Sequence, residues 1–432
     1  MTDNLIPGYR DPHRWVVFCV FSLIYFFVYF HRVSTSVIVS DLLASFRTNA
    51  TALGFMSSMY FYLYAAVQPV VGHLSDRFGP RRVIAFWSFA AAAGCFMFGL
   101  APTIGWASAG RALIGLGVGG VYVPTIKAIS QWFRKSEFTT ILGCFMAIGN
   151  VGAVIATTPL AWATDTWGWR STFFLIGGVT CILALAALLF TRDGAVTGDI
   201  TSIAEAPVSE KPSGLRKNIR RVISSPQFWL AGIIFFRLYG TLVTLQGLWA
   251  TPFLMTVLGI ERILASQINM VIPIGVIIGA PFFGWLTDRF ALEKRNIMIG
   301  IVFLYTLTWV GVTFLFSALG MIGLALVMLI MGMATGGFIS VLWGHIRENT
   351  PGDIMGLTSG LLNPAPFIGV AVFQVITGII LYRSGRIGDL YPVAGFKHAF
   401  MVCLAVSVAC LMLSFLLSRK KSPGRHSTPV RV

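Results

Sequence analysis

The chain has 432 residues, of which 56% are hydrophobic and only 11% are charged. About a quarter of the residues of an ordinary soluble domain are charged, so this composition excludes that class and indicates that lipid is the solvent. The formal net charge of +16 does not indicate a nucleic-acid partner, because the Lys and Arg residues stand in short clusters between apolar runs. That distribution is typical of membrane-protein loops.

Twelve apolar runs are long enough to cross a bilayer, which takes about 20 helical residues. In chain order they cover residues 15–40, 53–75, 82–101, 105–133, 138–163, 170–191, 227–256, 264–287, 296–317, 320–346, 355–382 and 396–418. They predict an all-α membrane protein with twelve transmembrane helices in two six-helix bundles, 1–191 and 227–418. Between them, 192–226 is rich in small, polar and charged residues and predicts a solvated linker, and 419–432 forms a tail.

The distribution of basic residues predicts which side of the membrane each loop faces. If both termini and the linker lie on one side, that side holds 22 Lys and Arg residues and the other side holds 6. The positive-inside rule therefore predicts a plasma membrane protein, bacterial by its loop pattern, with both termini in the cytoplasm. The first apolar run is too long for a signal peptide, so we expect it to remain as a helix.

A charged motif closes the second apolar run of each bundle. Residues 72–82 read GHLSDRFGPRR, and residues 284–289 read GWLTDR. Gly79-Pro80 predicts a sharp turn. This pattern resembles the loop between helices 2 and 3 of the major facilitator superfamily of secondary transporters, and the resemblance extends over almost the whole chain. It implies two pseudo-symmetric bundles of six helices that rock about a central site.

In that superfamily the motif latches the two bundles together in one state of the transport cycle. The resemblance gives this gating role to Asp76, Arg77 and Arg81, with Asp288 and Arg289 as the second-half counterparts. Ordinary loop topology is the alternative explanation for these charges. Arg111, followed by Gly115, Gly117 and Gly119, resembles the helix-4 pattern of the same superfamily. An arginine in an apolar helix needs a partner, so a structural role and a coupling role both stay open for it.

Polar residues deep in the predicted spans mark a candidate substrate cavity near the middle of the membrane. Helix 1 carries Tyr25, Tyr29, Arg32 and Ser36 at spacings of four, three and four, which place them on one face. We predict the following substrate-binding set: Arg32, Tyr29, Tyr25, Gln68, Tyr64, Asn150, Arg237, Gln246 and Asn363. For Arg32 the alternative is a buried structural arginine, and for the tyrosines it is packing.

Acidic residues are missing from the interior of the predicted spans. All 16 lie in loops or near helix ends. A cavity with arginine and no carboxylate has positive potential and attracts anions, and a guanidinium can hold a carboxylate or phosphate through two hydrogen bonds. We therefore expect a small anionic substrate and no intramembrane Asp or Glu that carries protons.

A narrower resemblance concerns helix 1. The run FFVYFHRVSTSVIVSDL, together with YVPTIKAISQWF and GNVGAVIA, resembles the organophosphate–phosphate antiporter branch, in which an arginine at the position of Arg32 binds phosphate. Two positions depart from that branch. Gln68 stands where a lysine is expected, and Arg237 lies earlier in its helix than the symmetry mate of Arg32 should. A carboxylate therefore fits better than a phosphate ester, as in related organic-anion branches.

Coupling and cofactors complete the expectations. His31 and His345 are candidate proton carriers, because imidazole titrates near neutrality, although packing is the simpler explanation for each. The six cysteines lie in apolar runs without metal-ligand spacing, and no GxxxxGK[ST] motif is present. We expect no cofactor, no metal, no enzyme activity and a monomer in the lipid bilayer.

These observations favour a secondary transporter of a small organic anion that works by alternating access, with proton symport or anion exchange. The first alternative is a multidrug or metabolite exporter of the same fold, because 35 Phe and 12 Trp residues are also compatible with an apolar cavity. The second is a transporter-like sensor that signals through a partner.

Overall fold

The computed structural model of the protein describes residues 11–193, 212–290, 292–351, 354–386 and 391–417. Within these ranges the chain forms helices and short connections and no β-strand. A helix satisfies its backbone N–H and C=O groups internally, which lipid cannot do for them, so long apolar runs take this form.

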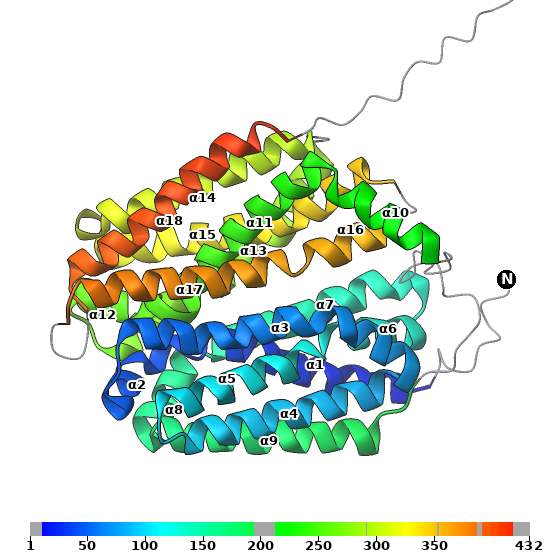
Figure 1. The fold of residues 1–432 in the computed structure, drawn as a ribbon, viewed down its shortest axis with the longest axis horizontal. Helices are drawn as coiled ribbons and strands as arrows, with labels where there is room; N and C mark the ends of the chain where they lie inside the picture. The colour runs from blue at the N-terminus through cyan, green and yellow to red at the C-terminus, as the bar shows by residue number, and fades with distance from the viewer. Residues whose placement is uncertain (1–10, 194–211, 291, 352–353, 387–390, 418–432) are drawn as a thin grey trace, which may run out of the picture.

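The first group of helices covers the N-terminal part of the chain (Figure 1). Its elements are α1 (His13–Val33), the 3₁₀ turn η2 (Ser36–Ile38), α2 (Val39–Phe46), α3 (Ala50–Phe78), α4 (Pro80–Leu100), α5 (Ile104–Gly119), α6 (Tyr122–Trp132), α7 (Lys135–Ile155), α8 (Thr158–Trp167) and α9 (Trp169–Phe190). We call this group, which ends at residue 193, the N-half.

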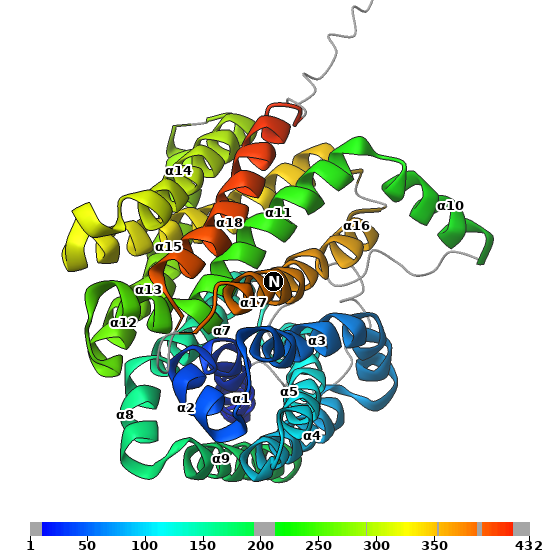
Figure 2. The ribbon, with the colours of Figure 1, turned by 60° about the vertical axis from the view of Figure 1, so that its left-hand side comes forward.

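The second group follows residue 212 and lies above the first in Figures 1 and 2. Its elements are α10 (Pro212–Ile223), α11 (Pro226–Thr244), the π-helical turn η3 (Leu245–Trp249), α12 (Ala250–Leu258), α13 (Arg262–Arg289), α14 (Lys294–Phe314), α15 (Phe316–Asn349), α16 (Met355–Leu362), α17 (Ala365–Arg383) and α18 (Val393–Ser414). We call α11 to α18 the C-half.

The number of membrane-spanning helices agrees with the twelve predicted runs. Eleven described helices are long and apolar enough to cross a membrane, and α7 and α8 together supply a twelfth span that is bent by 43°. The predicted all-α architecture with twelve spans is therefore confirmed.

Several spans are broken, which their uniform apolar composition did not predict. Span 1 is interrupted by η2, span 4 at Gly120, span 5 between α7 and α8, and span 7 by η3. Pro159 lies in the first turn of α8, where a missing N–H is tolerated. Irregular backbone at membrane depth is stable only where protein surrounds it or where it lines a cavity, so we expect each break to be covered by protein or to line the interior.

The predicted turn between spans 2 and 3 is present. Gly79 has a φ of 81°, a conformation that favours glycine, and Pro80 begins α4 at once. The linker differs from expectation in one respect, because its residues 212–223 form the helix α10. Val222, at the end of α10, is buried. This apolar contact is one reason why part of a polar linker is ordered.

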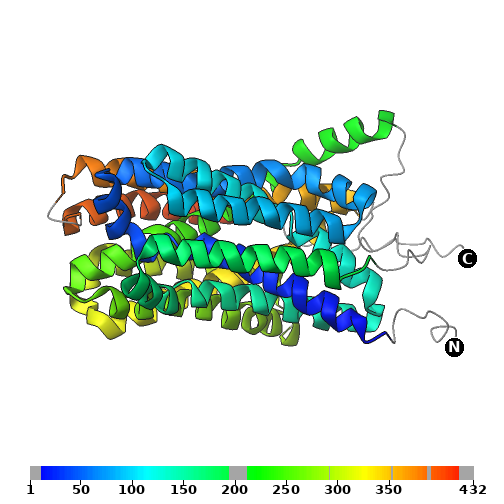
Figure 3. The same ribbon diagram turned by 90° about the horizontal axis from the view of Figure 1, so that it is seen from below.

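The helices run roughly parallel to one long axis, and the bundle has two distinct ends (Figures 1 and 3). α1 begins and α18 ends at the same end, which we call the terminal end. The opposite end, where α2 lies and α17 finishes, is called the distal end. These two names are used below because the halves meet differently at each end.

Candidate functional site

A small pocket lies between the two halves, about midway along the spans. Its wall is formed by Tyr29, Arg32, Val33, Asn150, Ala153, Tyr239, Leu242, Val243, Gln246, Pro273 and Val276. The open volume is about 30 Å³, which is room for water but not for an organic acid. A substrate at this site therefore requires the surrounding helices to separate.

Arg32 is the cation of this pocket, and the residue is only 4% exposed. Its Nη1 donates a hydrogen bond of 3.1 Å to the hydroxyl oxygen of Tyr239 on α11, in the other half. Its Nε is buried and donates to no acceptor in the described part of the chain. A buried guanidinium with an unsatisfied N–H favours an anionic ligand.

Aromatic rings surround the guanidinium of Arg32. Its Cζ lies 4.3 Å from the ring centre of Tyr29 and 5.0 Å from those of Tyr64 and Phe367. Tyr29 and Tyr64 come from the N-half, whereas Phe367 comes from α17 in the C-half. Cation–π attraction compensates part of the cost of burying the charge without a carboxylate.

Two amide side chains complete the polar part of the wall. Asn150 lies on α7, and its Nδ2 donates 3.0 Å to the carbonyl of Met146 one turn earlier. Gln246 lies in the π-helical turn η3, and its backbone carbonyl accepts from Asn269 at 3.0 Å. The break in span 7 therefore presents the Gln246 side chain to the pocket, as broken helices do in transporter sites.

The other predicted binding residues have different surroundings. Tyr25 is buried behind Tyr29, where it stacks on Phe145 with ring centres 4.0 Å apart. Gln68 lies nearer the terminal end, and its Nε2 donates 3.4 Å to the carbonyl of Gly119. Asn363 is partly buried at the end of α16 and does not line the pocket.

Arg237 is not brought together with Arg32. It is fully buried inside the C-half, where Nη1 donates 3.1 Å to Ser407 of α18 and Cζ lies 4.9 Å from the ring centre of Tyr305 on α14. The periodicity of the helix explains this placement. Arg237 and Gln246 are nine residues apart, about two and a half turns, and so point to opposite faces.

Arg111 and His31 lie together inside the N-half. Arg111 Nη1 donates 3.0 Å to the backbone carbonyl of His31, and its Cζ lies 5.0 Å from the ring centre of Tyr60. The His31 Nε2 atom is 3.6 Å from Cys95 Sγ. Arg111 therefore ties α5 to the segment of α1 that carries Arg32, which is a positioning role.

A larger pocket, about 270 Å³, lies at the terminal end beside His345. Its wall comes from α10, α11, α15 and α16, all on one side of the molecule, and it does not include Arg32. The His345 Nδ1 atom is 3.3 Å from Asn349 Nδ2. A transport site has to be reached from both sides of the membrane, so we take the smaller pocket between the halves as the candidate site.

The motif residues are held within the N-half in this structure. Asp76 accepts from Lys127 Nζ at 2.5 Å, and Arg81 donates to the carbonyl of Leu188. The guanidinium of Arg77 lies 5.3 Å from the ring centre of Phe78. In the second motif Arg289 is exposed, and the side chain of Asp288 lies outside the described residues.

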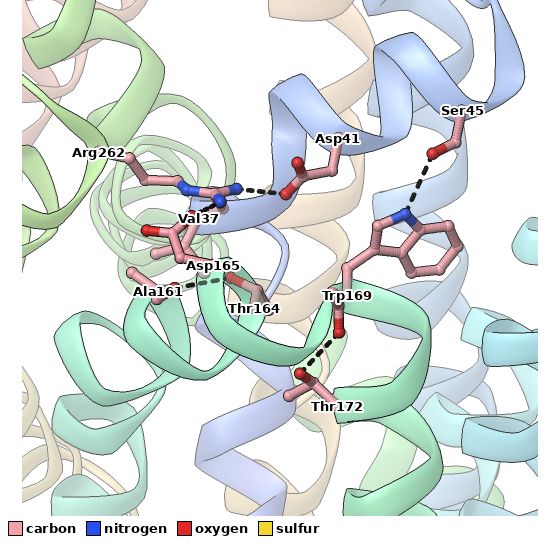
Figure 4. Close-up of polar contacts among 10 residues, drawn as sticks. Val37, Asp41, Ser45, Ala161, Thr164, Asp165, Trp169, Thr172 and Arg262 are labelled. Atoms are coloured by element: carbon pink, nitrogen blue, oxygen red, sulfur yellow. Dashed lines mark hydrogen bonds and ion pairs between the residues drawn. The ribbon is translucent and has the colours of Figure 1, made fainter.

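At the distal end, charged groups join the two halves. Arg262, at the start of α13, donates to the carboxylates of Asp41 on α2 and Asp165 on α8 (Figure 4). Its Nη1 also donates 3.4 Å to the carbonyl of Val37. We call these contacts the Arg262 latch. Burial raises the pKa of the Asp41 carboxyl above its usual range, and the nearby Arg262 cation opposes that rise.

Further contacts between the halves lie beside the Arg262 latch. Ser36 donates 3.1 Å to Thr251, and Ser266 donates 3.3 Å to Thr158. The Tyr391 hydroxyl accepts 2.6 Å from the backbone N–H of Ala50. The halves are therefore joined across the distal end.

Two aromatic residues near Arg32 were not predicted: Tyr239, which lines the pocket, and Phe367, whose ring lies beside the Arg32 guanidinium. Tyr239 and Gln246 are seven residues apart, two helical turns, and so share one face. That spacing was visible in the sequence, but the prediction singled out Arg237, which lies on the opposite face of α11, for its charge. Phe367 has no comparable signal, because the sequence contains 35 Phe residues and nothing local separates a ring beside a buried cation from one in lipid.

Comparisons with known proteins agree with this architecture. Residues 21–374 match the model of the Major Facilitator Superfamily. An uncharacterized transporter of Bacillus subtilis, YybO, is 27% identical over 414 residues, which cover 90% of this chain and 92% of that protein. A probable sulfoacetate transporter of Cupriavidus necator, SauU, is 22% identical over 444 residues, 97% and 99% of the two chains.

The fold is also similar to that of solved transporters. The inward-facing, occupied structure of a bacterial homologue of the human lysosomal transporter Spinster superimposes with a TM-score of 0.74 over 96% of this chain and 99% of that one. Its sequence identity is 18%, so this likeness concerns the fold alone.

Proposed function

Because this chain belongs to the major facilitator superfamily, a family of membrane transporters, we propose that it is a secondary transporter of a small organic anion. The observation that carries the proposal is Arg32. This arginine is buried at a pocket between the halves and has an unsatisfied N–H. No Asp or Glu belongs to the wall of that pocket, so the local potential is positive.

A carboxylate fits this site better than a phosphate ester. The pocket wall contains one arginine, because Arg237 lies inside the C-half and Gln68 is neutral. One guanidinium can hold one carboxylate through two parallel hydrogen bonds, whereas a dianionic phosphate needs more positive charge. The name of the relative SauU, a probable sulfoacetate transporter, is consistent with an organic-anion substrate in general.

Alternating access would expose the pocket to each side in turn. In the present structure the Arg262 latch joins the distal end, and the motif residue Asp76 is paired inside the N-half. These contacts support a state in which the distal end is closed. In the opposite state Asp76, Arg77 and Arg81 would latch the terminal end, with Asp288 and Arg289 as counterparts. Arg111 holds the Arg32 segment of α1 in position.

Orientation and location follow from charge. The described basic clusters of the motif loops lie at the terminal end, and the excess of 22 over 6 Lys and Arg residues counted along the sequence supports a cytoplasmic terminal end in a bacterial inner membrane. The distal end would then face outward. The Arg262 latch would be the outer gate of the transporter.

Two coupling modes fit this pocket, and they make different demands. Proton symport needs a titratable group, for which His31 is placed directly before Arg32, and His345 lies on the terminal side of the pocket. Anion exchange needs no such group. If His31 carries the proton of a symporter, His31→Gln should abolish accumulation driven by a pH gradient; if His345 carries it, His345→Gln should do so instead; under anion exchange both variants should keep counterflow of anions.

The test of the proposal is ligand binding by the full-length protein in detergent. Thermal unfolding is measured with carboxylates, phosphate esters, sugars and lipophilic cations, for the parent, Arg32→Gln and Arg47→Gln. Arg47 is an exposed arginine at the distal end and serves as the matched control. A ligand at a hundred times its Kd adds about 2.7 kcal/mol of stability. Stabilisation by carboxylates that is lost only in Arg32→Gln supports the proposal. Stabilisation by lipophilic cations, unchanged in Arg32→Gln, points to an exporter instead.

A further inference from the structure

Four aromatic side chains contact or face Arg32, which is more than a buried arginine needs to be held in place. Besides the three rings that face its guanidinium, Tyr239 meets it through the hydroxyl group. Tyr239 and Phe367 also pack edge to face, with ring centres 5.8 Å apart. The rings of Tyr64 and Phe367 lie 4.5 Å apart across the interface between the halves.

A second layer of rings stands behind Tyr29. The ring centres of Tyr25 and Tyr29 are 5.3 Å apart, and those of Tyr25 and Tyr122 are 5.7 Å apart in a stacked arrangement. This layer fixes the orientation of Tyr29. A ring that is held in place loses little entropy when it stacks on a ligand.

The polar groups of the pocket wall are few, and part of them is already engaged. The Asn150 amide donates to Met146, and the Tyr239 hydroxyl accepts from Arg32. The Gln246 amide and the Tyr29 hydroxyl make no hydrogen bond within the described part of the chain and remain open to a ligand. Apart from the rings of Tyr29 and Tyr239, the rest of the pocket wall is aliphatic, formed by residues such as Leu242 and Val276.

This inventory separates two classes of carboxylate. A sugar acid brings four or five hydroxyl groups, and each one that is buried without a partner costs about 1 to 3 kcal/mol. An aromatic acid brings one flat ring, and each favourable ring pair adds about 0.5 to 1.5 kcal/mol beyond the burial of apolar surface. The groups that line the closed pocket match the second class better than the first.

The placement of the rings on both halves also suits a flat ligand. Tyr29 and Tyr64 belong to the N-half, and Tyr239 and Phe367 belong to the C-half. When the halves separate, these rings move apart and leave a gap with aromatic faces on both sides. A single ring can enter such a gap while its carboxylate reaches the Arg32 guanidinium.

We propose that the preferred substrate is an aromatic monocarboxylate with one ring, whose carboxylate binds Arg32 and whose ring stacks between the aromatic side chains of the two halves. This inference rests on the proposed function and specifies its substrate class. Tyr29 and Phe367 are then specificity-determining residues. One or two hydroxyl groups on the ring are accommodated by Gln246 and by the Tyr29 hydroxyl.

The experiment compares matched ligands on the full-length protein in detergent, by isothermal titration calorimetry. Benzoate and 4-hydroxybenzoate are compared with cyclohexanecarboxylate, which has the same charge and a similar size but no aromatic ring, and with galactonate as a sugar acid. Benzoates should bind at least about tenfold more tightly than either of the other two. In Tyr29→Leu and Phe367→Leu the preference for benzoate over cyclohexanecarboxylate should shrink severalfold. The control Phe86→Leu changes a ring that is 71% exposed on α4 and should keep the preference.

Three other outcomes overturn the inference. Galactonate binding that equals or exceeds benzoate binding makes the substrate a sugar acid and leaves the anion-transporter proposal standing. Equal binding of benzoate and cyclohexanecarboxylate shows that the rings do not determine specificity, and it leaves the anion-binding role of Arg32 standing. Absence of binding by every carboxylate, in a parent protein that unfolds cooperatively, overturns the proposed function and this inference together.

Discussion

The two ends of the bundle hold their charges in different ways. At the distal end, Arg262 of the C-half is paired with Asp41 and Asp165 of the N-half (Figure 4). At the terminal end, Lys127 and Asp76 are paired within the N-half, and Lys294 and Glu348 are paired within the C-half. The distal pairs bind the halves to each other, whereas the terminal pairs stabilise each half separately.

Helix α3 shows the same difference along its own length. At its distal part, a Cβ atom on Gly54 would lie 2.3 Å from the carbonyl oxygen of Gln374 on α17, so the two helices are in backbone contact. At its terminal part, a Cβ atom on the motif residue Gly72 would meet no heavy atom within 4 Å. A closed end and an open end of one interface thus occur on a single helix, as rocking of the halves requires.

The largest expected effect comes from Gly54→Val. The added side chain meets the backbone of α17, which cannot move aside as a flexible side chain can, and overpacking of this kind costs about 1 to 3 kcal/mol. The closed distal end should lose population. Spin labels at the exposed residues Thr166 and Ser317, one in each half at the distal end, should report longer distances by double electron–electron resonance.

Gly72→Val is the matched control for that experiment, because it makes the same change in the same helix and alters helix propensity in the same direction. It should leave the Thr166–Ser317 distance at the parental value. It should slow transport, since the terminal end has to close around position 72 in the other state. Equal distance changes in both variants would contradict the difference between the two ends.

Arg262→Gln should open the distal end to a smaller extent. The change leaves the carboxylates of Asp41 and Asp165 next to each other without their cation. The latch is partly exposed, with side-chain exposures of 15% for Arg262, 30% for Asp41 and 36% for Asp165, so the expected cost is about 1 to 2 kcal/mol. The same spin-label pair should show a longer distance population in Arg262→Gln and not in Arg47→Gln. Identical distance distributions in these two variants would show that the latch does not hold the end closed.

The distal end should also respond to pH. The pKa of Asp41 is raised in the closed state because burial penalises the carboxylate more than Arg262 favours it. An exposed Asp titrates near about 3.9, so between that value and the raised one the closed state binds a proton that the open state lacks. Acidification through this window therefore favours closure.

The Arg262 cation attracts the Asp41 carboxylate and so opposes the rise in the pKa of Asp41. Because Arg262→Gln removes this attraction, the distal end of the variant should respond to pH more strongly than that of the parent. Its long-distance population at pH 7.5 should shrink at pH 4.5. Adding Asp41→Asn should reduce that response. A pH response of the same size after Asp41→Asn would assign the titration to another group.

The smallest effect on stability is expected for Asp76→Asn. The Asp76 side chain is 68% exposed, and exposed ion pairs contribute about 0.2 to 1 kcal/mol. Thermal unfolding should therefore change little. If Asp76 latches the terminal end in the other state, uptake into proteoliposomes should slow by up to about fivefold while ligand affinity in detergent stays at the parental value. A parental uptake rate would confine Asp76 to its local pair with Lys127.

The fold could be predicted because a long apolar run in lipid has to form a helix to satisfy its backbone hydrogen bonds. The twelve spans and the turn at Gly79 follow from composition and from one motif. The breaks inside the spans could not be predicted in the same way, because a π-helical turn such as Leu245–Trp249 depends on tertiary neighbours and not on local propensity.

The part of the candidate site that lies on single helices could be predicted from helical periodicity. The spacing of Tyr29 and Arg32 placed both on the pocket side of α1, and Asn150 and Gln246 also line the pocket. Arg237 was included in the predicted site for its charge, whereas its position on α11 places it inside the C-half in this structure. The Arg262 latch was not predicted, because it joins residues more than 90 positions apart and no local pattern relates such residues.

The measurement that tests the anion-transporter proposal most directly is uptake of a radiolabelled carboxylate into proteoliposomes, by the parent, Arg32→Gln and Arg47→Gln. If Arg32 binds the carboxylate, the parent and Arg47→Gln should take up benzoate in a saturable way. Arg32→Gln should lose at least about 90% of the initial rate, because losing a charged hydrogen bond of about 1.5 to 3 kcal/mol weakens binding tenfold or more. Saturable uptake by Arg32→Gln at the parental rate would contradict the role of Arg32 and, with it, the assignment of the pocket as the anion site.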